Sequence, residues 1–211
     1  MILFQEVKKL VRKNCRVNEK ALPVLFFFTD RKQFPDIFEV IKSMPNAGAA
    51  IIVREYDLSH SDRTEFAKKI IKIAKEKSLL VLIGKNLKMA LELKADGVHF
   101  SDHDNCWKKY STLKLKKNFI FTCSTHSSKS LNKSYKSDFY AVLYSPIFTT
   151  KTHLNQKSVG VLNLAKIALK SKIPLYALGG VNLSNLRQLK NCYISGIAGI
   201  SIFSLKENEK N

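Results

Sequence analysis

Short apolar runs recur eight times along this chain of 211 residues, and segments with helical spacing separate most of them. The runs are rich in Val, Ile, Leu and Phe. Strands that helices cover on both faces have this composition, whereas a strand with one face in water alternates apolar and polar residues. We therefore predict eight buried strands, at residues 23–28, 49–53, 79–83, 97–100, 119–123, 139–144, 174–178 and 199–203.

Helical periodicity is clearest after the second predicted strand, where one face is apolar and lysines occupy the others. Asp62 or Ser61 is the expected N-cap of this helix, because both side chains can accept a hydrogen bond from a first-turn amide. The segment after the fifth strand has the weakest pattern, since it is polar and rich in serine. The predicted helices are 63–77, 86–93, 127–135, 161–169 and 184–189.

Alternation of strands and helices is typical of the α/β class. Eight strands within about 190 residues favour a single (β/α)₈ TIM barrel, in which the parallel sheet closes on itself. A doubly wound open sheet is the alternative, because alternation alone does not distinguish a closed sheet from one with free edges.

The chain before the first strand has an amphipathic pattern of its own. We predict a helical extension at residues 1–22, whose apolar positions would cover the bottom of the barrel or a partner, so a homo-oligomer stays open. These positions are Leu3, Val7, Leu10 and Val11. The barrel is expected to span 23–205 and a polar tail 206–211.

The charge balance is strongly positive, with 36 Lys and Arg against 17 Asp and Glu and a net charge of +19. The basic residues are spread along the chain without an arginine-rich arm or zinc-finger spacing, so a nucleic-acid partner is not expected. The chain contains neither an apolar stretch long enough to span a membrane nor a secretory signal. Four widely spaced cysteines predict reduced, structural thiols, and together these features predict a cytoplasmic protein.

Chemistry in a barrel of this type collects where the strands end and the following loops begin. Gly179 and Gly180 come directly after the seventh predicted strand and before a helix opened by Asn182 and Ser184. Glycines let backbone amides approach an anion closely, and a helix N-terminus favours negative charge. The sequence therefore predicts a phosphate site here, to which the serines after the eighth strand, Ser201 and Ser204, would contribute.

His126 follows the fifth predicted strand and is the best candidate for proton transfer. An imidazole can act as acid or base near neutral pH without a metal. Ser124 and Thr125 are the residues expected to orient it. Cys123, beside them, has no base next to it in the sequence, and we predict that it belongs to the core.

A second group of polar residues surrounds the end of the fourth strand: His99, Asp102, His103 and Asp104. Consecutive residues of an extended strand point to opposite faces, so these four side chains are not expected to converge. One carboxylate on Mg²⁺ remains an option, whereas a zinc site is not expected.

Several motifs at the predicted strand ends resemble those of the thiamine phosphate synthase/TenI family, over roughly 24–204. They occur in the family's order: Arg-Glu-Tyr-Asp-Leu at 54–58, Ala-Asp-Gly-Val-His at 95–99, Ser-Thr-His-Ser at 124–127, Pro-Ile-Phe-Thr-Thr-Lys-Thr at 146–152, Ala-Leu-Gly-Gly-Val at 177–181 and the final segment 199–204. Several independent motifs in register make the resemblance strong.

The resemblance implies a barrel that binds a phosphorylated thiazole. The residues that would meet this ligand and its phosphate are Thr150, Thr152, Gly179, Gly180, Phe203 and Ser204. In the synthase branch of the family, a hydroxymethylpyrimidine pyrophosphate also binds with Mg²⁺. Its pyrophosphate leaves, and the thiazole nitrogen attacks the resulting cation. Arg54 would then be an anion contact and Asp104 a metal ligand.

The chain departs from the synthase branch at the positions that handle the metal. Gly84-Lys85-Asn86 stands where that branch has Asn-Asp-Arg, so a lysine replaces a metal-binding aspartate. Of the Gly-Gln-Glu-Asp pattern after the fourth strand, only Asp104 is retained. Loss of a hard oxygen ligand should be severe for a Mg²⁺ site, and a lysine cannot orient two phosphate oxygens as a metal does.

Two further departures concern substrate contacts. Ile52 replaces a glutamine before Arg54, and His153 stands where a lysine is expected after the 146–152 motif. Lys151 or Lys157 could compensate for that lysine. The polar loop 151–157 is predicted to be a mobile lid.

The chain keeps the predicted phosphate site and His126, and this combination resembles the TenI branch of the family. Thiazole tautomerases of that branch need no metal, and a histidine at this position moves a proton to aromatise a carboxythiazole phosphate. A positioned acid or base typically contributes about 10² to 10⁴ in rate. The alternatives, in order, are a divergent Mg²⁺-dependent thiamine phosphate synthase, a non-catalytic binder of thiazole or thiamine phosphates, and a nucleic-acid binder.

Overall fold

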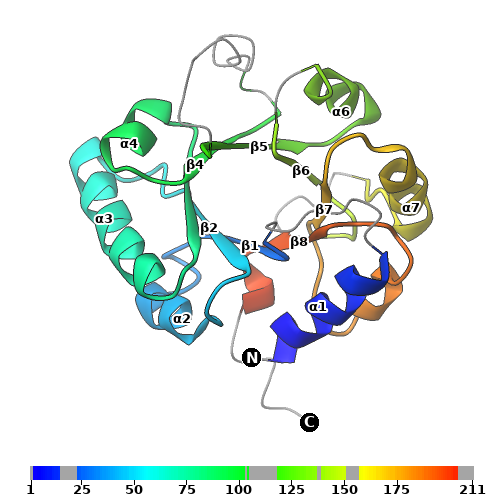
Figure 1. Ribbon diagram of the computed structural model, residues 1–211, viewed down its shortest axis with the longest axis horizontal. Coiled ribbons are helices and arrows are strands. Elements are labelled where there is room, and N and C mark those ends of the chain that lie inside the picture. Colours follow the sequence, from blue (N-terminus) through cyan, green and yellow to red (C-terminus); the bar gives the residue numbers. More distant parts are fainter. Residues whose placement is uncertain are drawn as a thin grey trace.

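Eight parallel strands close into a barrel in sequence order, and β1 pairs with both β2 and β8 (Figure 1). The computed structural model describes residues 2–14, 23–102, 104, 118–136, 139–150 and 157–203. Closure confirms the predicted barrel and excludes the open sheet. The strands are β1 (Leu25–Phe28), β2 (Ala49–Val53), β3 (Leu80–Gly84), β4 (Gly97–Phe100), β5 (Ile120–Thr125), β6 (Ala141–Tyr144), β7 (Leu175–Leu178) and β8 (Gly196–Gly199).

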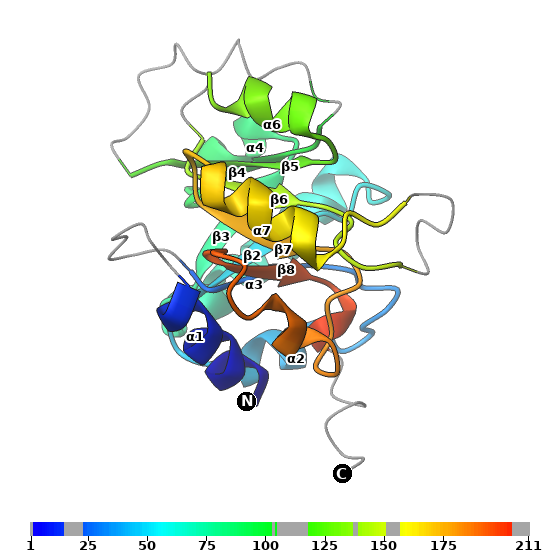
Figure 2. The same cartoon turned by 90° about the vertical axis from the view of Figure 1, so that its right-hand side faces the viewer.

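Helices surround the barrel on its outer side (Figures 1 and 2). The helix between β1 and β2, which has seven residues, was not among the predicted ones. The described helices are α1 (Ile2–Asn14), α2 (Ile37–Ser43), α3 (His60–Glu76), α4 (Leu87–Glu92), α6 (Ser128–Ser134), α7 (Val161–Lys170) and the 3₁₀ helices η2 (Leu186–Leu189) and η3 (Ser201–Phe203).

Strand residues alternate between two apolar layers, as the pleat of a strand requires. In β1, Phe26 and Phe28 belong to the barrel interior, whereas Phe27 belongs to the layer between strands and helices. The interior is filled by large side chains: the ring of Tyr176 meets that of Phe26 edge-on, and its hydroxyl donates to the Pro23 carbonyl at 2.6 Å. The interior is therefore a packed core rather than a pore.

The eighth strand lies before the predicted one. We predicted 199–203, but β8 is Gly196–Gly199 and η3 follows it. The true strand has little apolar bulk because space is short there: a Cβ on Gly196 would lie 2.3 Å from the Val24 carbonyl oxygen. The more apolar sequence after it forms a 3₁₀ turn instead.

Two predicted helix starts also require correction. Ser59, not Asp62 or Ser61, caps α3, because its hydroxyl accepts the Asp62 amide at 3.1 Å. The helix predicted at 184–189 is a single 3₁₀ segment, Leu186–Leu189. Asn182 and Asn185 instead close a turn before it through the Asn185 amide, which donates to Asn182 Oδ1 at 3.0 Å.

Helix α1 occupies a place in the outer ring, between α7 and α2, where it packs against β8 and η2 (Figure 1). The apolar face that the sequence predicted is buried at Leu3, Val7 and Leu10. Phe4 reaches the bottom rim of the barrel, where a Cβ on Gly48 would lie 2.8 Å from its ring. The N-terminal helix, predicted to cover the bottom of the barrel or a partner, thus packs mainly against the side of the barrel. Residues 15–22 and 206–211, the rest of the predicted extension and the predicted tail, lie outside the described residues.

Candidate functional site

The carboxyl ends of all eight strands lie at the same end of the barrel, because the strands are parallel. Arg54 follows β2, Asp104 follows β4, His126 follows β5, and Gly179 with Gly180 follows β7. These candidates are therefore brought to one end, as predicted. Thr152, Ser204, Lys151 and His153 lie outside the described residues, as does most of the predicted lid.

The His126 ring is held from β6 rather than from its own strand. Its Nδ1 lies 3.0 Å from the Ser145 hydroxyl and 3.2 Å from the Ser145 carbonyl oxygen. A carbonyl oxygen can only accept, so this contact favours the tautomer with the proton on Nδ1 and a basic Nε2. The His126 backbone amide donates to Asp102 Oδ2 at 3.2 Å, which joins the ends of β4 and β5.

Ser124 and Thr125 do not orient His126 as predicted. Both belong to β5, which extends to Thr125. The Ser124 hydroxyl lies 3.0 Å from His99 Nε2, inside the barrel, and the buried Thr125 Oγ1 has no hydrogen-bond partner among the described residues. The sequence did not point to Ser145, because it lies 19 residues from His126 and meets it only through the pairing of β5 with β6.

His99 is buried in the barrel interior, with its ring centroid 5.2 Å from that of Phe28. Its Nδ1 lies 2.8 Å from the Thr122 hydroxyl and its Nε2 3.0 Å from that of Ser124. Burial lowers the pKa of His99 to about 3, so the ring is neutral near pH 7. Within the described chain, no three His, Cys, Asp or Glu side chains gather in a way that could hold a metal ion.

The two glycines after β7 adopt positive φ angles, +88° at Gly179 and +70° at Gly180. A Cβ at Gly180 would lie 2.7 Å from both the Phe148 Cβ and the Thr149 carbonyl oxygen. The loop after β6 therefore requires glycine here on packing grounds alone. Phosphate binding at these amides remains a prediction, without a helix N-terminus beneath it because η2 is one short 3₁₀ segment.

The residues after β8 differ in their surroundings. Ser201 is exposed, whereas Phe203 is buried in the outer layer with its ring centroid 4.5 Å from that of Phe27. The Phe203 amide donates to the Ile200 carbonyl at 3.2 Å. Phe203 is therefore part of the core packing, and ligand contacts by Ser201 and Phe203 stay predictions. Thr150 lies near Gly179, 3.5 Å from where a Cβ would stand.

Arg54 extends over the end of β2, and its side chain is about one-third exposed, at 34%. Its Nε donates to the Thr29 carbonyl at 3.2 Å and its Nη2 to Asp30 Oδ2 at 3.2 Å. These contacts offset the desolvation cost of placing a guanidinium at a buried strand end. Part of the guanidinium still faces solvent.

Lys85 forms an ion pair with Asp104 across the ends of β3 and β4. Lys85 Nζ lies 3.7 Å from Asp104 Oδ1, and Asp104 Oδ2 accepts the Ser101 hydroxyl at 2.9 Å and the Ser101 amide at 2.6 Å. Asp104, which matches the synthase pattern, and Lys85, which departs from it, are thus direct neighbours.

This donor set does not fit Mg²⁺. The ion needs near-octahedral oxygen coordination at about 2.0–2.1 Å. Among the described residues, Asp104 is the carboxylate beside Lys85; one of its oxygens is engaged by Ser101, and the other faces the ammonium group. A divalent cation at Asp104 Oδ1 would be repelled by Lys85 at close range.

Two residues near this ion pair were not singled out from the sequence. Arg63 of α3 is buried and donates through Nη2 to the carbonyl oxygens of Val53, at 3.0 Å, and Gly84, at 2.6 Å. The Tyr56 ring lies between two cations, 5.1 Å from the Arg63 guanidinium and 5.3 Å from Lys85 Nζ. Arg63 therefore joins the ends of β2 and β3. Its position in a helix otherwise rich in exposed cations concealed this role.

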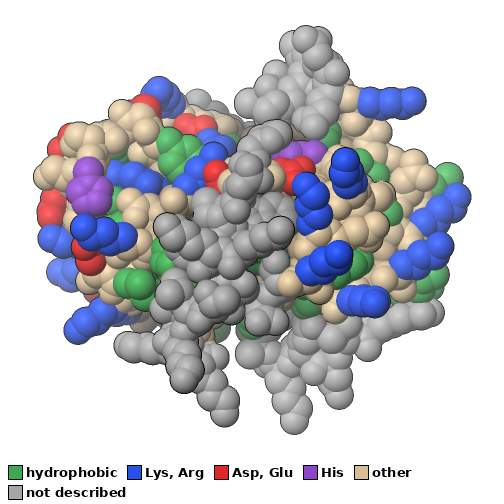
Figure 3. Space-filling model, turned by 90° about the horizontal axis from the view of Figure 1, so that it is seen from above, with side chains coloured by type: hydrophobic (Ala, Val, Ile, Leu, Met, Phe, Trp, Pro, Cys, Tyr) green, Lys and Arg blue, Asp and Glu red, His purple; other side chains and the backbone are tan. Residues whose placement is uncertain are grey.

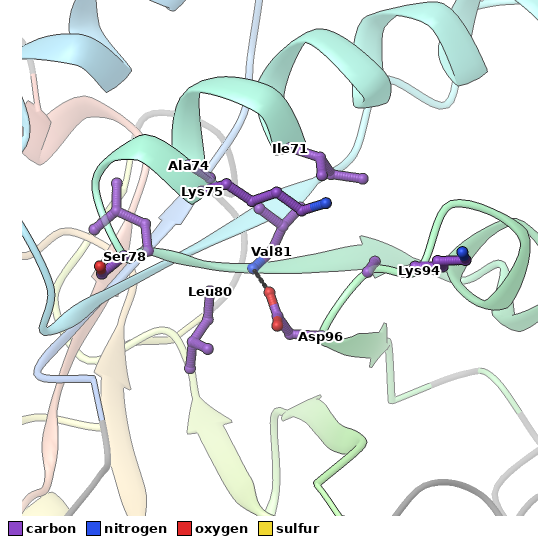
Figure 4. Close-up of a pocket in the computed structure, with 10 residues that line it drawn as sticks. Ile71, Ala74, Lys75, Ser78, Leu80, Val81, Lys94 and Asp96 are labelled. Carbon is purple, nitrogen blue, oxygen red and sulfur yellow. Dashed lines mark hydrogen bonds between the residues drawn. The ribbon is translucent and has the colours of Figure 1, made fainter.

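A cavity of about 300 Å³ lies at the opposite end of the barrel, below β3 and β4. Lys75, Lys94 and Asp96 are among its lining residues, and Asp96 Oδ2 accepts the Val81 amide at 2.7 Å (Figure 4). This hydrogen bond ties the start of β3 to the start of β4. The cavity lies away from the strand ends that carry the candidate residues.

On the face drawn in Figure 3, Lys and Arg side chains lie on both sides of the molecule, with Asp and Glu among them on the left. No described helix is long and apolar enough to cross a membrane. Cys123 and Cys192 are buried free thiols, and burial raises the pKa of each, so Cys123 belongs to the core as predicted.

Known proteins resemble this chain over nearly all of its barrel. A protein of Aquifex aeolicus named "Putative thiamine-phosphate synthase 2" is 33% identical over 187 residues, which cover 86% of this chain and 98% of that protein. A thiamine-phosphate synthase of Fusobacterium nucleatum is 29% identical over 190 residues, covering 88% of this chain and 92% of that protein.

The solved structure of a thiamine phosphate pyrophosphorylase from Pyrococcus furiosus has the same fold. It matches with a TM-score of 0.72 at 23% identity and covers 85% of this chain and 86% of that one. The family described as Thiamine monophosphate synthase matches residues 25–203, from the first residue of β1 to the last residue of η3. The chain therefore belongs to the thiamine monophosphate synthase family, in agreement with the motifs at its strand ends.

Proposed function

We propose that this protein binds a thiazole phosphate at the carboxyl ends of its strands and isomerises the ring by proton transfer through His126. The observation that carries this proposal is the fixed imidazole: Ser145 holds Nδ1 through both its hydroxyl and its carbonyl oxygen. The ring stands after β5, among the strand ends where substrates of such barrels bind.

The proposed step needs no cofactor. His126 Nε2 accepts a proton from a ring carbon of the non-aromatic carboxythiazole phosphate, and a proton returns to another position as the ring becomes aromatic. No atom is gained or lost, so the reaction is an isomerisation. Gly179, Gly180 and Ser201 would hold the phosphate, and this arrangement avoids the metal that the Lys85–Asp104 pair does not accommodate.

The test replaces His126 by Gln, which keeps a polar side chain of similar reach but cannot transfer the proton. We expect kcat for tautomerisation to fall by about 10² to 10⁴ while the affinity for the aromatic product changes little. The matched control is His60→Gln, because His60 is exposed at the start of α3. Tautomerisation by His126→Gln at the wild-type rate would exclude this function.

A second candidate is thiamine phosphate synthesis, and the names of the relatives favour it. The purified protein would then join hydroxymethylpyrimidine pyrophosphate to thiazole phosphate. Product formation can be followed by chromatography with Mg²⁺ and with a chelator. Formation of thiamine phosphate at a catalytic rate would establish this candidate in place of the isomerase. Tight ligand binding with neither activity would support a non-catalytic binder.

A further inference from the structure

The ends of β2, β3 and β4 carry a cluster of charged groups that the proposed proton transfer does not use. It consists of Arg54, Lys85 and Asp104, and we call it the Lys85 corner. Val53 pairs with Ile83 in the parallel ladder, so Arg54 stands beside Gly84 and one residue from Lys85. Lys85 Nζ lies 3.7 Å from Asp104 Oδ1, so the three charged groups follow adjacent strands at the same end of the barrel.

Lys85 is fixed at this corner by two contacts. Its ammonium lies 3.7 Å from Asp104 Oδ1 and 5.3 Å from the centroid of the Tyr56 ring, whose other neighbour is Arg63. Its backbone adopts φ +59°, an uncommon conformation for a residue with a long side chain. Neighbouring strands thus determine where the charge is placed.

Both cationic side chains of the Lys85 corner are partly exposed to solvent. The Lys85 side chain is 41% exposed and that of Arg54 34% exposed. An ammonium has three donors, and its contact with Asp104 is longer than a good charged hydrogen bond. The guanidinium offers further N–H groups beyond those given to Thr29 and Asp30.

We propose that Lys85 is the resident cation of this corner, so that Lys85 and Arg54 bind an anionic ligand group, a phosphate or pyrophosphate, without a divalent metal. The family's metal does not fit the donor set, and the ammonium stands beside the carboxylate that a metal would need. An ammonium supplies one positive charge and up to three hydrogen bonds, which is enough to bind a phosphate oxygen.

Inorganic pyrophosphate is a suitable probe, titrated into the intact protein by calorimetry with and without EDTA. We expect wild-type affinity to be the same in both conditions, Lys85→Gln to lose about tenfold or more, and Lys85→Arg to stay within a few-fold. The control is Lys88→Gln, which removes the same charge from the adjacent helix at a side chain that is 85% exposed. Binding that requires Mg²⁺, or a Lys85→Gln variant that binds as tightly as wild type, would overturn the proposal.

A second variant tests whether Lys85 is what keeps a divalent metal from binding at this corner. Lys85→Asp places two carboxylates at the corner, and aspartate tolerates the left-handed backbone better than lysine does, so the variant should fold. We expect Lys85→Asp to bind Mn²⁺ with about 1:1 stoichiometry in calorimetry or paramagnetic resonance, and wild type not to bind it. Wild-type binding of Mn²⁺ that Asp104→Asn abolishes would contradict the proposal.

The outcome is separable from that of the proposed function. His126→Gln should leave pyrophosphate binding unchanged, because His126 follows β5 and is not part of the Lys85 corner. Failure of the tautomerase assay therefore leaves the anion site standing, and failure of the pyrophosphate titrations leaves the isomerase standing.

Discussion

Polar side chains at the strand ends of this barrel are held by partners from neighbouring strands. Ser145 of the β6 end holds His126 of the β5 end, Ser124 of β5 contacts His99 of β4, and Asp104 contacts Lys85. Hydrogen bonds of this kind set the direction of each functional group, which a catalytic or binding site requires. The sequence identified His126 but not Ser145, which lies 19 residues away from it in the chain.

His99 makes stability depend on pH at the residue scale. Its pKa is about 3 in the folded protein because burial penalises the charged ring, against an ordinary value of 6.5. Between these values the unfolded chain binds a proton that the folded protein does not bind. The free energy of unfolding should therefore fall as the pH decreases from about 6.5 toward 3, by up to about 1.4 kcal/mol per pH unit from this group.

Urea unfolding at several pH values between 7 and 4 measures this effect. His99→Gln should show a shallower decrease than wild type, whatever its stability at pH 7, because Gln does not titrate. His60→Gln, at an exposed position, should keep the wild-type slope. Equal slopes for wild type and His99→Gln would show that His99 does not govern the acid sensitivity.

At the scale of elements, apolar runs located seven strands well and one poorly. β8 was predicted too late in the chain because Gly196, Ala198 and Gly199 give it little hydrophobic signal, and at Gly196 the Val24 carbonyl leaves no room for a side chain. Helix α3 was predicted from its apolar face, but its cap was placed two or three residues late. Periodicity marks the body of a helix, whereas the cap depends on one hydrogen bond.

Ser59→Ala should therefore destabilise the protein by about 1 kcal/mol, because the Asp62 amide loses the hydroxyl that accepts it. Ser61→Ala is the matched control, since Ser61 lies within the exposed first turn of α3. Chemical denaturation of the two variants distinguishes them. A loss of stability in Ser61→Ala but not in Ser59→Ala would restore the cap first expected from the sequence.

At the scale of the whole molecule, the N-terminal helix α1 forms part of the ring of helices around the barrel. Helix α1 packs against β8 and η2, so the N-terminal helix lies beside the last strand (Figure 1). Among the described residues, β8 is followed by the short η3. The apolar outer side of β8 is thus covered by α1, although α1 (Ile2–Asn14) and β8 (Gly196–Gly199) lie at opposite ends of the described chain.

Phe4→Ala tests this arrangement. The Phe4 ring is buried against Gly48, and its removal leaves a cavity between α1 and the barrel. We expect a loss of about 3–5 kcal/mol, measured by denaturant unfolding. Ile2→Ala, at a position that is 66% exposed, should change stability by less than about 0.5 kcal/mol. A near-neutral Phe4→Ala would mean that α1 contributes little to the barrel.

The sequence by itself determined the α/β class, the order of strands and helices, and the strand ends at which the candidate residues gather. These features follow from periodicity over a few residues, which local sequence carries directly. Only the tertiary structure decided that the sheet closes, that α1 lies beside β8, that Ser145 holds His126 and that Lys85 neutralises Asp104. Each of these joins segments far apart in the chain, and such contacts depend on how twisted strands pair and close rather than on local pattern.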